Sequence, residues 1–360
     1  MNTQTDVLIT GGGTGGHVYP ALALAQELVD RGGDPAAIHF VGARRGLEAR
    51  VVPDAGFAID LLPGRGLQRR FAIANVGAMW ENIVAFFRAW KIVGRLRPRV
   101  VVGVGGYASL PCLLAAWCRR VPMVVHEQNA APGLANRIAA RLGARTAVSL
   151  PGTPLRGAIV TGNPVRAAIR AVRRAPTPGL VAIFGGSLGA RRVNDAALEL
   201  YDLWRSRHDV AIHHIAGVRD YDGCMTRLAQ LQRADDALGY ELVQYEHDMP
   251  NVYARASLAV CRAGAVTVAE LCVAGVPAVL VPLPGAPGDH QTRNAEVLVD
   301  GGAAVLVPDS ECNGRRLDAV TSPLLADKAE LDAMAVGART LARPDAAARL
   351  ADLVEEAARA

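Results

Sequence analysis

The chain starts the same structural pattern twice, each time with a short apolar strand, a glycine-rich turn and a helical segment. In the first copy a strand at Asp6–Thr10 leads into the turn Gly11–His17, and in the second a strand at Leu180–Phe184 leads into Gly185–Ala190. Repeated units of strand, turn and helix build parallel sheets that carry helices on both faces. We therefore predict an α/β chain with two Rossmann-like, doubly wound parallel-sheet domains.

The length of 360 residues also favours two domains, because a single core rarely grows beyond about 250–300 residues. The boundary is expected within Thr161–Arg166, so that residues 1–163 form the first domain and residues 164–343 the second. A helix over residues 344–360 is expected to pack back on the first domain. Helices are predicted from about Pro20 to Asp30, from about Val193 and at Val266–Ala274. Further strands are predicted at Ile38–Val41, Val100–Val104, Met123–His126, Arg145–Val148, Val160–Gly162, Val210–Ile215, Glu241–Gln244, Leu258–Cys261, Ala278–Val281 and Ala304–Val307.

The formal net charge of +5 comes from the first half of the chain. Residues 1–163 hold 18 Lys and Arg against 9 Asp and Glu, whereas residues 164–360 hold 21 against 25. A basic half of this kind points to nucleic acid, an anionic membrane or a phosphorylated ligand as a partner.

The six cysteines form no CxxC pair, and several lie in apolar runs. This pattern predicts buried free thiols in a reducing compartment. The first ten residues are polar and then strand-like, so we expect no signal peptide.

Residues 100–118 carry no charge, and their length approaches that of a membrane span. Gly105, Gly106, Ser109 and Pro111 interrupt the run in its middle. We therefore expect a buried strand, a glycine turn and a helix here, and only peripheral contact with a membrane.

The first glycine turn satisfies GxGxxG, a pattern whose bare backbone N–H groups receive a phosphate or another polar ligand at a helix N-terminus. A dinucleotide site would add an acidic residue after the second strand, to hold a ribose. Arg44 and Arg45 stand there instead and suit the phosphate of NADP, so an NADP-dependent oxidoreductase stays open at this point. His17 ends the turn and is either a general base facing a crevice or a residue that only caps and packs.

Two later segments suit a phosphorylated ligand bound between the domains. The turn Gly185–Ala190 repeats the first, although α/β proteins also use such turns for structure alone. Gly264 and Ala265 open a helix whose small residues leave its N–H groups accessible to a diphosphate. Glu270, further along that helix, is either a ligand of ribose hydroxyls or a solvated helix residue.

Polar side chains follow two other predicted strands. His126–Asn129 lies at the carboxyl end of an apolar strand, which is the edge where open α/β sheets bind ligands. Asp289–Asn294 offers amide and carboxylate groups suited to sugar hydroxyls, although an ordinary polar loop has the same composition. The sequence contains no DxD pair and no Cys/His spacing typical of zinc, so we expect no metal and no cofactor.

Together these motifs resemble, in order and spacing, the MurG family of peptidoglycan N-acetylglucosaminyltransferases, glycosyltransferase family 28. The resemblance covers about residues 6–345 and rests on GGTGGHxxP at Gly12–Pro20, GGY at Gly105–Tyr107, HEQN at His126–Asn129, GNPVR at Gly162–Arg166, GGSxGA at Gly185–Ala190 and RxGAxTVxE at Arg262–Glu270. It implies a GT-B fold and inverting transfer of N-acetylglucosamine from UDP-GlcNAc to the C4 hydroxyl of the muramyl sugar of undecaprenyl-linked lipid I, which yields lipid II. It also implies a role in cell-wall synthesis, cell shape and cell division.

By this resemblance His17 is the catalytic base. The segment Tyr245–Met249 borders the uracil, mostly through backbone groups. The substrate-binding residues implied are Thr14, Gly15, Gly16, Tyr107, Glu127, Asn129, Arg166, Ser187, Gly189, Glu246, Met249, Arg262, Gly264, Ala265, Val266, Thr267, Val268, Ala269, Glu270, His290 and Gln291.

Four positions depart from the family pattern. Leu188 stands where Gln is usual, His290 replaces the first residue of a Gln pair, and Ala263 replaces a frequent Ser. Glu246 stands at a position that is commonly apolar. These departures affect expected donor contacts and remove no group that the chemistry requires.

A basic segment rich in aromatic residues, 67–97, predicts peripheral binding to anionic inner-membrane lipids on the cytoplasmic side, although a core helix with a solvated basic face is the other interpretation. The membrane-facing residues expected are Ile73, Met79, Trp80, Phe86, Phe87 and Trp90. The partners expected are UDP-GlcNAc, lipid I, anionic lipids and other cell-wall and division proteins, without nucleic acid. Transfer to a different acceptor and a binding protein that has lost catalysis are the remaining alternatives.

Overall fold

The computed structural model describes the backbone of residues 5–63 and 74–360, and the side chains of residues 5–63 and 81–360. The chain forms two compact units. The first comprises Met1–Arg166 and Arg343–Ala360, and the second comprises Ala167–Ala342. The divisions expected from the sequence, after residues 163 and 343, lie close to these.

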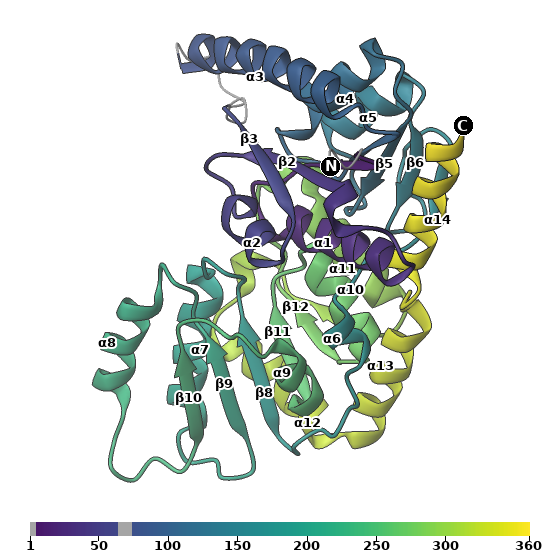
Figure 1. The fold of residues 1–360 in the computed structure, drawn as a ribbon. Helices are drawn as coiled ribbons and strands as arrows, with labels where there is room; N and C mark the ends of the chain where they lie inside the picture. Colours follow the sequence, from purple (N-terminus) through teal and green to yellow (C-terminus); the bar gives the residue numbers. More distant parts are fainter. Residues whose placement is uncertain (1–4, 64–73) are drawn as a thin grey trace. The chain divides into compact units, whose positions relative to one another are not determined.

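The first unit is built on a seven-stranded sheet with the order β3-β2-β1-β4-β5-β6-β7, in which every pairing of the described strands is parallel (Figure 1). The strands are β1 (Val7–Thr10), β2 (Ile38–Ala43), β3 (Ala58–Leu62), β4 (Val100–Gly103), β5 (Met123–Glu127), β6 (Arg145–Val148) and β7 (Ala158–Val160). The sequence analysis missed β3, an edge strand that carries Asp60 in its middle. It placed β7 at residues 160–162, two residues too late.

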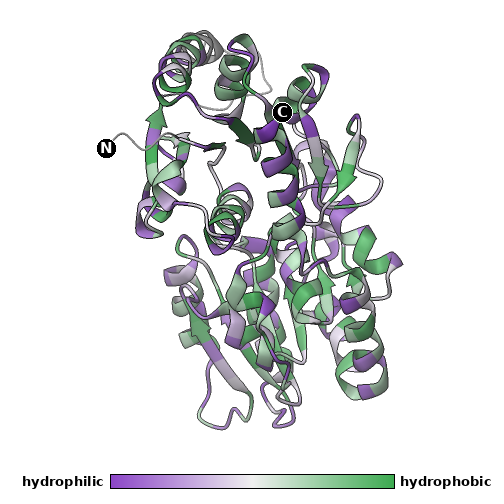
Figure 2. Ribbon diagram, turned by 45° about the vertical axis from the view of Figure 1, so that its right-hand side comes forward, coloured by the Kyte–Doolittle hydropathy of each residue, from purple (hydrophilic) through white to green (hydrophobic). Residues whose placement is uncertain are grey.

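Side chains of successive strand residues point to opposite faces of this sheet, and helices cover both faces. Val7 and Ile9 pack in one apolar cluster with α1 (Gly15–Asp30), α2 (Glu48–Asp54) and α14 (Ala346–Arg359). Leu8, between them, packs in another cluster with α3 (Ala74–Leu96), α4 (Ser109–Cys118) and α5 (Leu134–Arg141). In Figure 2 the helices around the sheets carry hydrophobic and hydrophilic residues in alternation, as this two-sided packing requires.

The start of α1 differs from the prediction. The helix begins at Gly15, and Pro20 lies inside it rather than at its start. The glycine turn and the helix therefore merge, so that His17 stands in the first turn of α1 and not in the preceding loop.

The second unit repeats the arrangement with a six-stranded sheet of order β10-β9-β8-β11-β12-β13. Its strands are β8 (Leu180–Phe184), β9 (Ala211–Ile215), β10 (Gly239–Val243), β11 (Leu258–Cys261), β12 (Ala278–Leu280) and β13 (Ala304–Leu306). Its helices are α6 (Ala167–Arg170), α7 (Arg191–Trp204), α8 (Tyr221–Leu231), α9 (Met249–Arg255), α10 (Ala265–Ala274), α11 (His290–Asp300), α12 (Gly314–Ala326) and α13 (Lys328–Leu341). The predicted fold class, two doubly wound parallel sheets, is confirmed.

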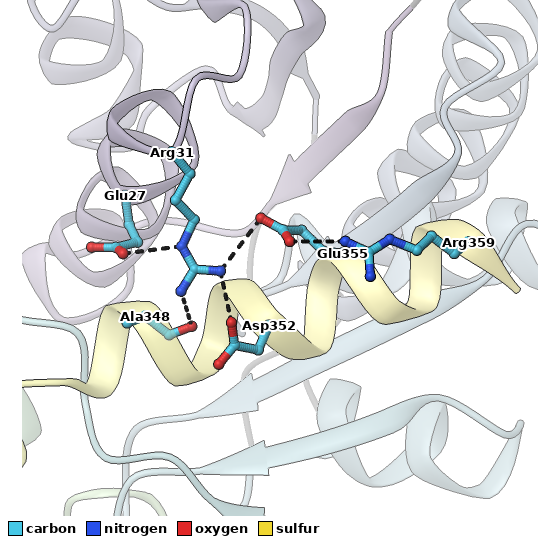
Figure 3. Close-up of polar contacts among 6 residues, drawn as sticks. All are labelled: Glu27, Arg31, Ala348, Asp352, Glu355 and Arg359. Atoms are coloured by element: carbon cyan, nitrogen blue, oxygen red, sulfur yellow. Dashed lines mark hydrogen bonds and ion pairs between the residues drawn. The ribbon is translucent and has the colours of Figure 1, made fainter.

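The C-terminal helix α14 belongs to the first unit. Leu350 and Val354 of this helix are almost completely buried in the cluster that also contains α1. Figure 3 shows Arg31, the C-cap residue of α1, directed at α14, where its Nη1 lies 2.7 Å from Asp352 and its Nη2 donates to the carbonyl of Ala348 at 2.8 Å. The last helix thus completes the core formed by the first 166 residues.

The uncharged segment 100–118 is divided as predicted, into β4, a glycine turn and α4. In the part of the chain that the structure describes, none of the helices is long and apolar enough to cross a membrane.

All six cysteines are free thiols. Five of them are buried, but Cys118 is exposed at the end of α4, so the expectation of buried thiols is wrong for this residue.

Candidate functional site

In each sheet the chain adds strands first toward one edge and then toward the other. The order reverses between β1 and β4 in the first unit and between β8 and β11 in the second. In doubly wound folds, ligands bind outside the carboxyl ends of the strands at this point. The turns Gly11–His17 and Gly105–Tyr107 follow β1 and β4, and the turns Gly185–Ala190 and Arg262–Gly264 follow β8 and β11. The four glycine motifs therefore lie at the ligand-binding edges of their own sheets.

The glycine turn of the first unit holds a carboxylate of the protein itself. Glu48 is 2% exposed, and its Oε2 accepts the N–H of Gly13 at 2.8 Å while its Oε1 accepts the N–H of Ala43 at 2.8 Å. A side chain at Gly12 would place its Cβ 2.1 Å from Oε1, so the turn closes tightly on this carboxylate. Glu48 was not predicted as a functional residue.

His17 is half-buried in the first turn of α1. Its Nδ1 lies 3.4 Å from Oγ1 of the exposed Thr14, while its Nε2 edge lies over Gly105, where an added Cβ would approach within 3.0 Å. The N–H groups of Gly15 and Gly16 donate no hydrogen bond to other described residues. The His17 imidazole therefore lies at the N-terminal end of α1, which carries the positive end of the helix dipole.

Tyr107 follows the second glycine turn of this unit and is half-buried. Burial raises the pKa of its hydroxyl, and the negative charge of Glu48 raises it further, while Arg45 lowers it. The hydroxyl is therefore a neutral hydrogen-bonding group at physiological pH.

Glu127, which is expected to contact substrate, bonds its own loop in the structure. It is 3% exposed, and its two carboxylate oxygens accept from the N–H of Asn129 at 3.1 Å, the N–H of Gly133 at 2.9 Å and Nδ2 of Asn136 at 2.9 Å. We infer that Glu127 shapes the loop that presents the half-buried Asn129.

In the second unit the turn Gly185–Ala190 packs against the loop after β9. Gly186 and Gly189 have φ values of +94° and +85°, a conformation that side chains rarely adopt. A Cβ on Gly189 would also lie 2.1 Å from the carbonyl oxygen of Ala216. The turn leaves Ser187 exposed to solvent.

The N-terminus of α10 is open. Gly264 is its N-cap without a side-chain hydrogen bond, and its first turn contains no acidic residue. An uncapped helix start carries roughly half a positive charge and binds phosphate groups. Glu270 lies in the second turn, 5% exposed, and accepts the hydroxyl of Tyr253 at 3.0 Å.

Arg262 is directed away from this helix start. Its Nη1 donates to the carbonyls of Val281 at 3.1 Å and Pro282 at 2.9 Å and lies 2.6 Å from Asp309. These contacts join β11 to the segments after β12 and β13, and the direct substrate contact expected of Arg262 stays a prediction.

The two sheets match the two halves of one family. The glycosyltransferase family 28 N-terminal domain matches residues 7–148, and the glycosyltransferase family 28 C-terminal domain matches residues 180–350. The chain belongs to glycosyltransferase family 28.

The similarity to other family 28 proteins covers almost the whole chain. A UDP-N-acetylglucosamine–N-acetylmuramyl-(pentapeptide) pyrophosphoryl-undecaprenol N-acetylglucosamine transferase of Alkalilimnicola ehrlichii is 43% identical over 363 aligned positions, covering 98% of this chain and 99% of its own. The protein of the same name from Salinibacter ruber is 41% identical and covers 98% and 96%. The crystal structure of Acinetobacter baumannii MurG has a TM-score of 0.78 at 32% identity and covers 98% of this chain and 99% of its own.

Among the departures from the family 28 pattern, Leu188 is 61% exposed at the tip of its turn, so it fills no core position. His290 starts α11, and its Nδ1–H donates to the carbonyl of Pro287 at 2.9 Å. Gln291 accepts the N–H of Leu283 through Oε1 at 2.9 Å, so its amide nitrogen takes no part in this contact. Ala263 is completely buried, and its carbonyl accepts Nδ2 of Asn294.

Glu246 belongs to the segment Tyr245–Met249, which is expected to border the uracil, and it makes contacts within and outside this segment. Its Oε1 accepts the N–H of Asp248 at 2.7 Å, and its Oε2 lies 3.3 Å from Nε2 of His213. Met249 begins α9, whose N-cap is Asp248. The carboxylate of Glu246 therefore holds the backbone of this segment in place.

Three residues of these sites were not predicted from the sequence: Glu48, Tyr253 and Asp309. Each has a partner 17 to 47 positions away, bonded through an oxygen that no local motif reveals. Within the residues whose side chains the structure describes, no group of three or more His, Cys, Asp and Glu is arranged to hold a metal ion.

Proposed function

We propose that this protein transfers N-acetylglucosamine from UDP-GlcNAc to the C4 hydroxyl of the muramyl sugar of undecaprenyl-diphospho-muramoyl-pentapeptide, with inversion at the anomeric carbon. The observation that carries the proposal is the family 28 similarity to transferases of that name over the full chain. The two ligand-binding sheet edges, each with its own glycine turn and open helix start, supply the groups that this reaction needs.

His17 is the general base of the proposed reaction. Its imidazole takes the proton of the C4 hydroxyl as the oxygen attacks the anomeric carbon and UDP departs with the bonding electrons. Thr14, Gly15 and Gly16 form the N-terminus of α1 beside it and bind the polar part of the acceptor. Tyr107 and Asn129 lie on neighbouring loops of the same sheet edge.

The donor binds to the second unit in this proposal. The open start of α10, with the exposed Ser187 and the turn at Gly189, stabilises the charge that develops on the departing diphosphate. Glu270 accepts hydrogen bonds from the ribose, and the segment Tyr245–Met249 borders the uracil. Gln291 and His290 face the sugar, with one amide in place of the usual two. Arg166, whose guanidinium lies 5.1 Å from the Tyr19 ring, remains a candidate diphosphate ligand.

The geometry disfavours the NADP-dependent oxidoreductase. A dinucleotide needs the N–H groups of the glycine turn for its diphosphate. Glu48 already occupies the N–H of Gly13 with a buried negative charge, which would repel a second anion at that point. Transfer of the same sugar to a different acceptor is the alternative that the experiment below must exclude.

We also propose peripheral binding of the first unit to anionic lipid through α3 and α4. Ile83 and Phe87, one turn apart on α3, are 44% and 59% exposed, and Trp117 of α4 is 49% exposed. Arg88 and Lys91 are exposed beside them and suit anionic head groups.

Two of the expected membrane residues are placed differently. Phe86 and Trp90 are half-buried and pack against the core of the first unit, and the Trp90 ring lies 4.4 Å from the Arg119 guanidinium. The other expected residues, Ile73, Met79 and Trp80, lie outside the side chains that the structure describes. Contacts with other cell-wall and division proteins, and location at the cytoplasmic membrane face, are further proposals from the family resemblance.

The deciding experiment is turnover of a short-chain lipid I analogue with UDP-GlcNAc and, separately, with UDP-GalNAc. We expect transfer from UDP-GlcNAc only, and His17→Ala should reduce kcat by about 10²–10⁴-fold while leaving UDP-GlcNAc binding nearly unchanged. Tight NADPH binding without UDP binding, or activity only with another acceptor, would overturn the proposal.

A further inference from the structure

Gln128, which follows β5, has a buried oxygen without a hydrogen-bond partner. The residue is 1% exposed, and its Nε2 donates to the carbonyl of Val104 at 3.0 Å. Because a carbonyl oxygen only accepts, this contact fixes which end of the amide is the nitrogen. Its Oε1 has no hydrogen-bond partner among the described residues. Buried polar atoms of this kind are rare and call for an explanation.

His126 locks the amide of Gln128 in this orientation. The His126 Nε2 lies 2.9 Å from the carbonyl oxygen of Gly162 and must therefore donate to it. Its Nδ1, 3.0 Å from Gln128 Nε2, is then the acceptor. Complete burial lowers the pKa of His126 to about 4, so the ring is neutral with its proton on Nε2. Turning the amide would set Oε1 against two acceptors, Val104 O and His126 Nδ1.

The unpartnered oxygen of Gln128 and the imidazole of His17 both lie close to Gly105. A Cβ added to Gly105 would lie 3.7 Å from Gln128 Oε1 and 3.0 Å from His17 Nε2. Gly105 has a φ of +92° and no side chain, which keeps this space open. The other ring nitrogen of His17, Nδ1, lies on the side of the exposed Thr14.

We propose that Gln128 is a positioning residue for the base, and that its Oε1 accepts the Nε2–H of His17, after a small rotation of the imidazole or through one water. This inference rests on the proposed function of His17. It assigns the unprotonated Nδ1, beside Thr14, as the atom that takes the proton.

The step balances. The hydroxyl oxygen of the acceptor bonds to the anomeric carbon, the bond from that carbon to UDP breaks, and UDP keeps the electron pair. The hydroxyl proton moves to Nδ1, and the resulting imidazolium donates through Nε2–H to Oε1 of Gln128. A charged N–H is a stronger donor than a neutral one, so this contact strengthens as the proton moves.

The first measurement is made on the wild-type protein, and a variant serves only to assign the histidine signals. Long-range ¹⁵N–¹H NMR of histidine-labelled full-length protein at a pH where His17 is neutral, assigned by comparison with His17→Ala, reports which nitrogen carries the proton. We expect the Nε2–H tautomer. A His17 ring protonated on Nδ1 overturns the inference, whatever the transferase assay shows.

The second measurement compares Gln128→Met, which keeps the length of the side chain but removes its oxygen, with Ser149→Ala. Ser149 Oγ lies 3.4 Å from His126 Nε2, so the control loses a contact of the same buried network without removing the oxygen that faces His17. We expect Gln128→Met to lower kcat about 10–100-fold with little change in KM for UDP-GlcNAc. The acid limb of its pH–rate profile should move to lower pH, because the imidazolium has lost an acceptor.

A Gln128→Met protein that keeps the tautomer, the kcat and the pH profile of wild type overturns the inference. If the variant does not fold, the tautomer of wild type still decides it. Failure of the proposed function has a different signature, namely a wild-type protein without lipid I turnover or a His17→Ala variant that retains full turnover.

Discussion

The N–H of Gly13 donates to the carboxylate of Glu48 at 2.8 Å, although the two residues are 35 positions apart. The same carboxylate accepts the N–H of Ala43 at the end of β2. A glycine-rich turn that binds nucleotide phosphates elsewhere is therefore closed here on an internal anion. In the proposed reaction, the start of α1 rather than the turn itself therefore meets the substrate.

Replacement of Glu48 by Gln should destabilise the first unit. The amide has one oxygen for two N–H donors, so one buried N–H loses its partner, at a cost of about 1–3 kcal/mol in the free energy of unfolding. Turnover should fall as well, because the glycine turn precedes His17. Urea denaturation and the lipid I assay measure the two effects.

Glu356→Gln is the matched control for Glu48→Gln, since its carboxylate is 58% exposed and pairs with Arg145 on the surface. Such a pair contributes about 0–1 kcal/mol. Equal stability and activity of the two variants would contradict the role assigned to Glu48.

The attachment of α14 should depend more on packing than on its ion pairs. Leu350 is completely buried, so Leu350→Ala should lower the free energy of unfolding by about 2–5 kcal/mol. Arg31→Met removes partly exposed ion pairs to Asp352 and Glu355 and should cost about 1 kcal/mol or less. Denaturant unfolding of both variants measures the two free energies of unfolding. A larger loss of stability for Arg31→Met than for Leu350→Ala would show that the ion pairs matter more than the packing.

The sequence predicted the architecture because central strands such as β1, β4 and β11 are apolar runs that are buried on both faces of a parallel sheet. It missed β3, where the polar Asp60 interrupts an edge strand, and it placed the start of α1 too late because Pro20 lies inside the helix. Local patterns of apolar residues thus predicted the repeated strand–turn–helix units. The errors arose where a single residue, Asp60 or Pro20, interrupts such a pattern.

The sequence predicts where groups that belong to a local motif lie, while their binding and catalytic roles stay predictions. The start of α10 and the position of His17 follow from their own turns. Glu48 could not be found in this way, because it bonds the backbone of Gly13, 35 positions away. Arg262 and Glu127 bond groups of the protein through their charged ends, and the substrate contacts expected of them stay predictions.

The stability of the first unit should fall as the pH decreases from about 6.5 toward 4. Burial lowers the pKa of His126 from 6.5 to about 4, so between these values the unfolded chain binds a proton that the folded chain does not. Stability therefore rises with pH over this window and becomes independent of this group above it. The full difference is on the order of 3 kcal/mol.

His126→Asn removes this titration, so its free energy of unfolding should change less between pH 7 and pH 4.5 than that of wild type. Comparison with wild type cancels the carboxylates that titrate in both proteins. An unchanged slope in His126→Asn would show that His126 is charged in the folded state.

Binding to anionic vesicles should require the exposed apolar residues of α3. Ile83→Ser combined with Phe87→Ser removes two side chains that could enter the lipid surface, each worth about 1.5–3 kcal/mol when fully buried. Sedimentation with phosphatidylglycerol vesicles should show at least about tenfold weaker binding. Val336→Ser, on an exposed site of α13 in the second unit, should bind as wild type does. Equal binding by all three proteins would exclude this face as the lipid contact.

Glu270 should contribute to donor affinity through its negative charge. Hydrogen bonds to charged groups contribute about 1.5–3 kcal/mol, so Glu270→Gln should weaken UDP binding by about 10–100-fold in isothermal titration. Tyr253→Phe, which removes the hydroxyl that Glu270 accepts, should have a smaller effect because the carboxylate remains. The exposed Glu296 of α11 supplies the control variant Glu296→Gln, with unchanged affinity. A Glu270→Gln protein that loses stability but binds UDP as tightly as wild type would limit Glu270 to holding Tyr253 in place.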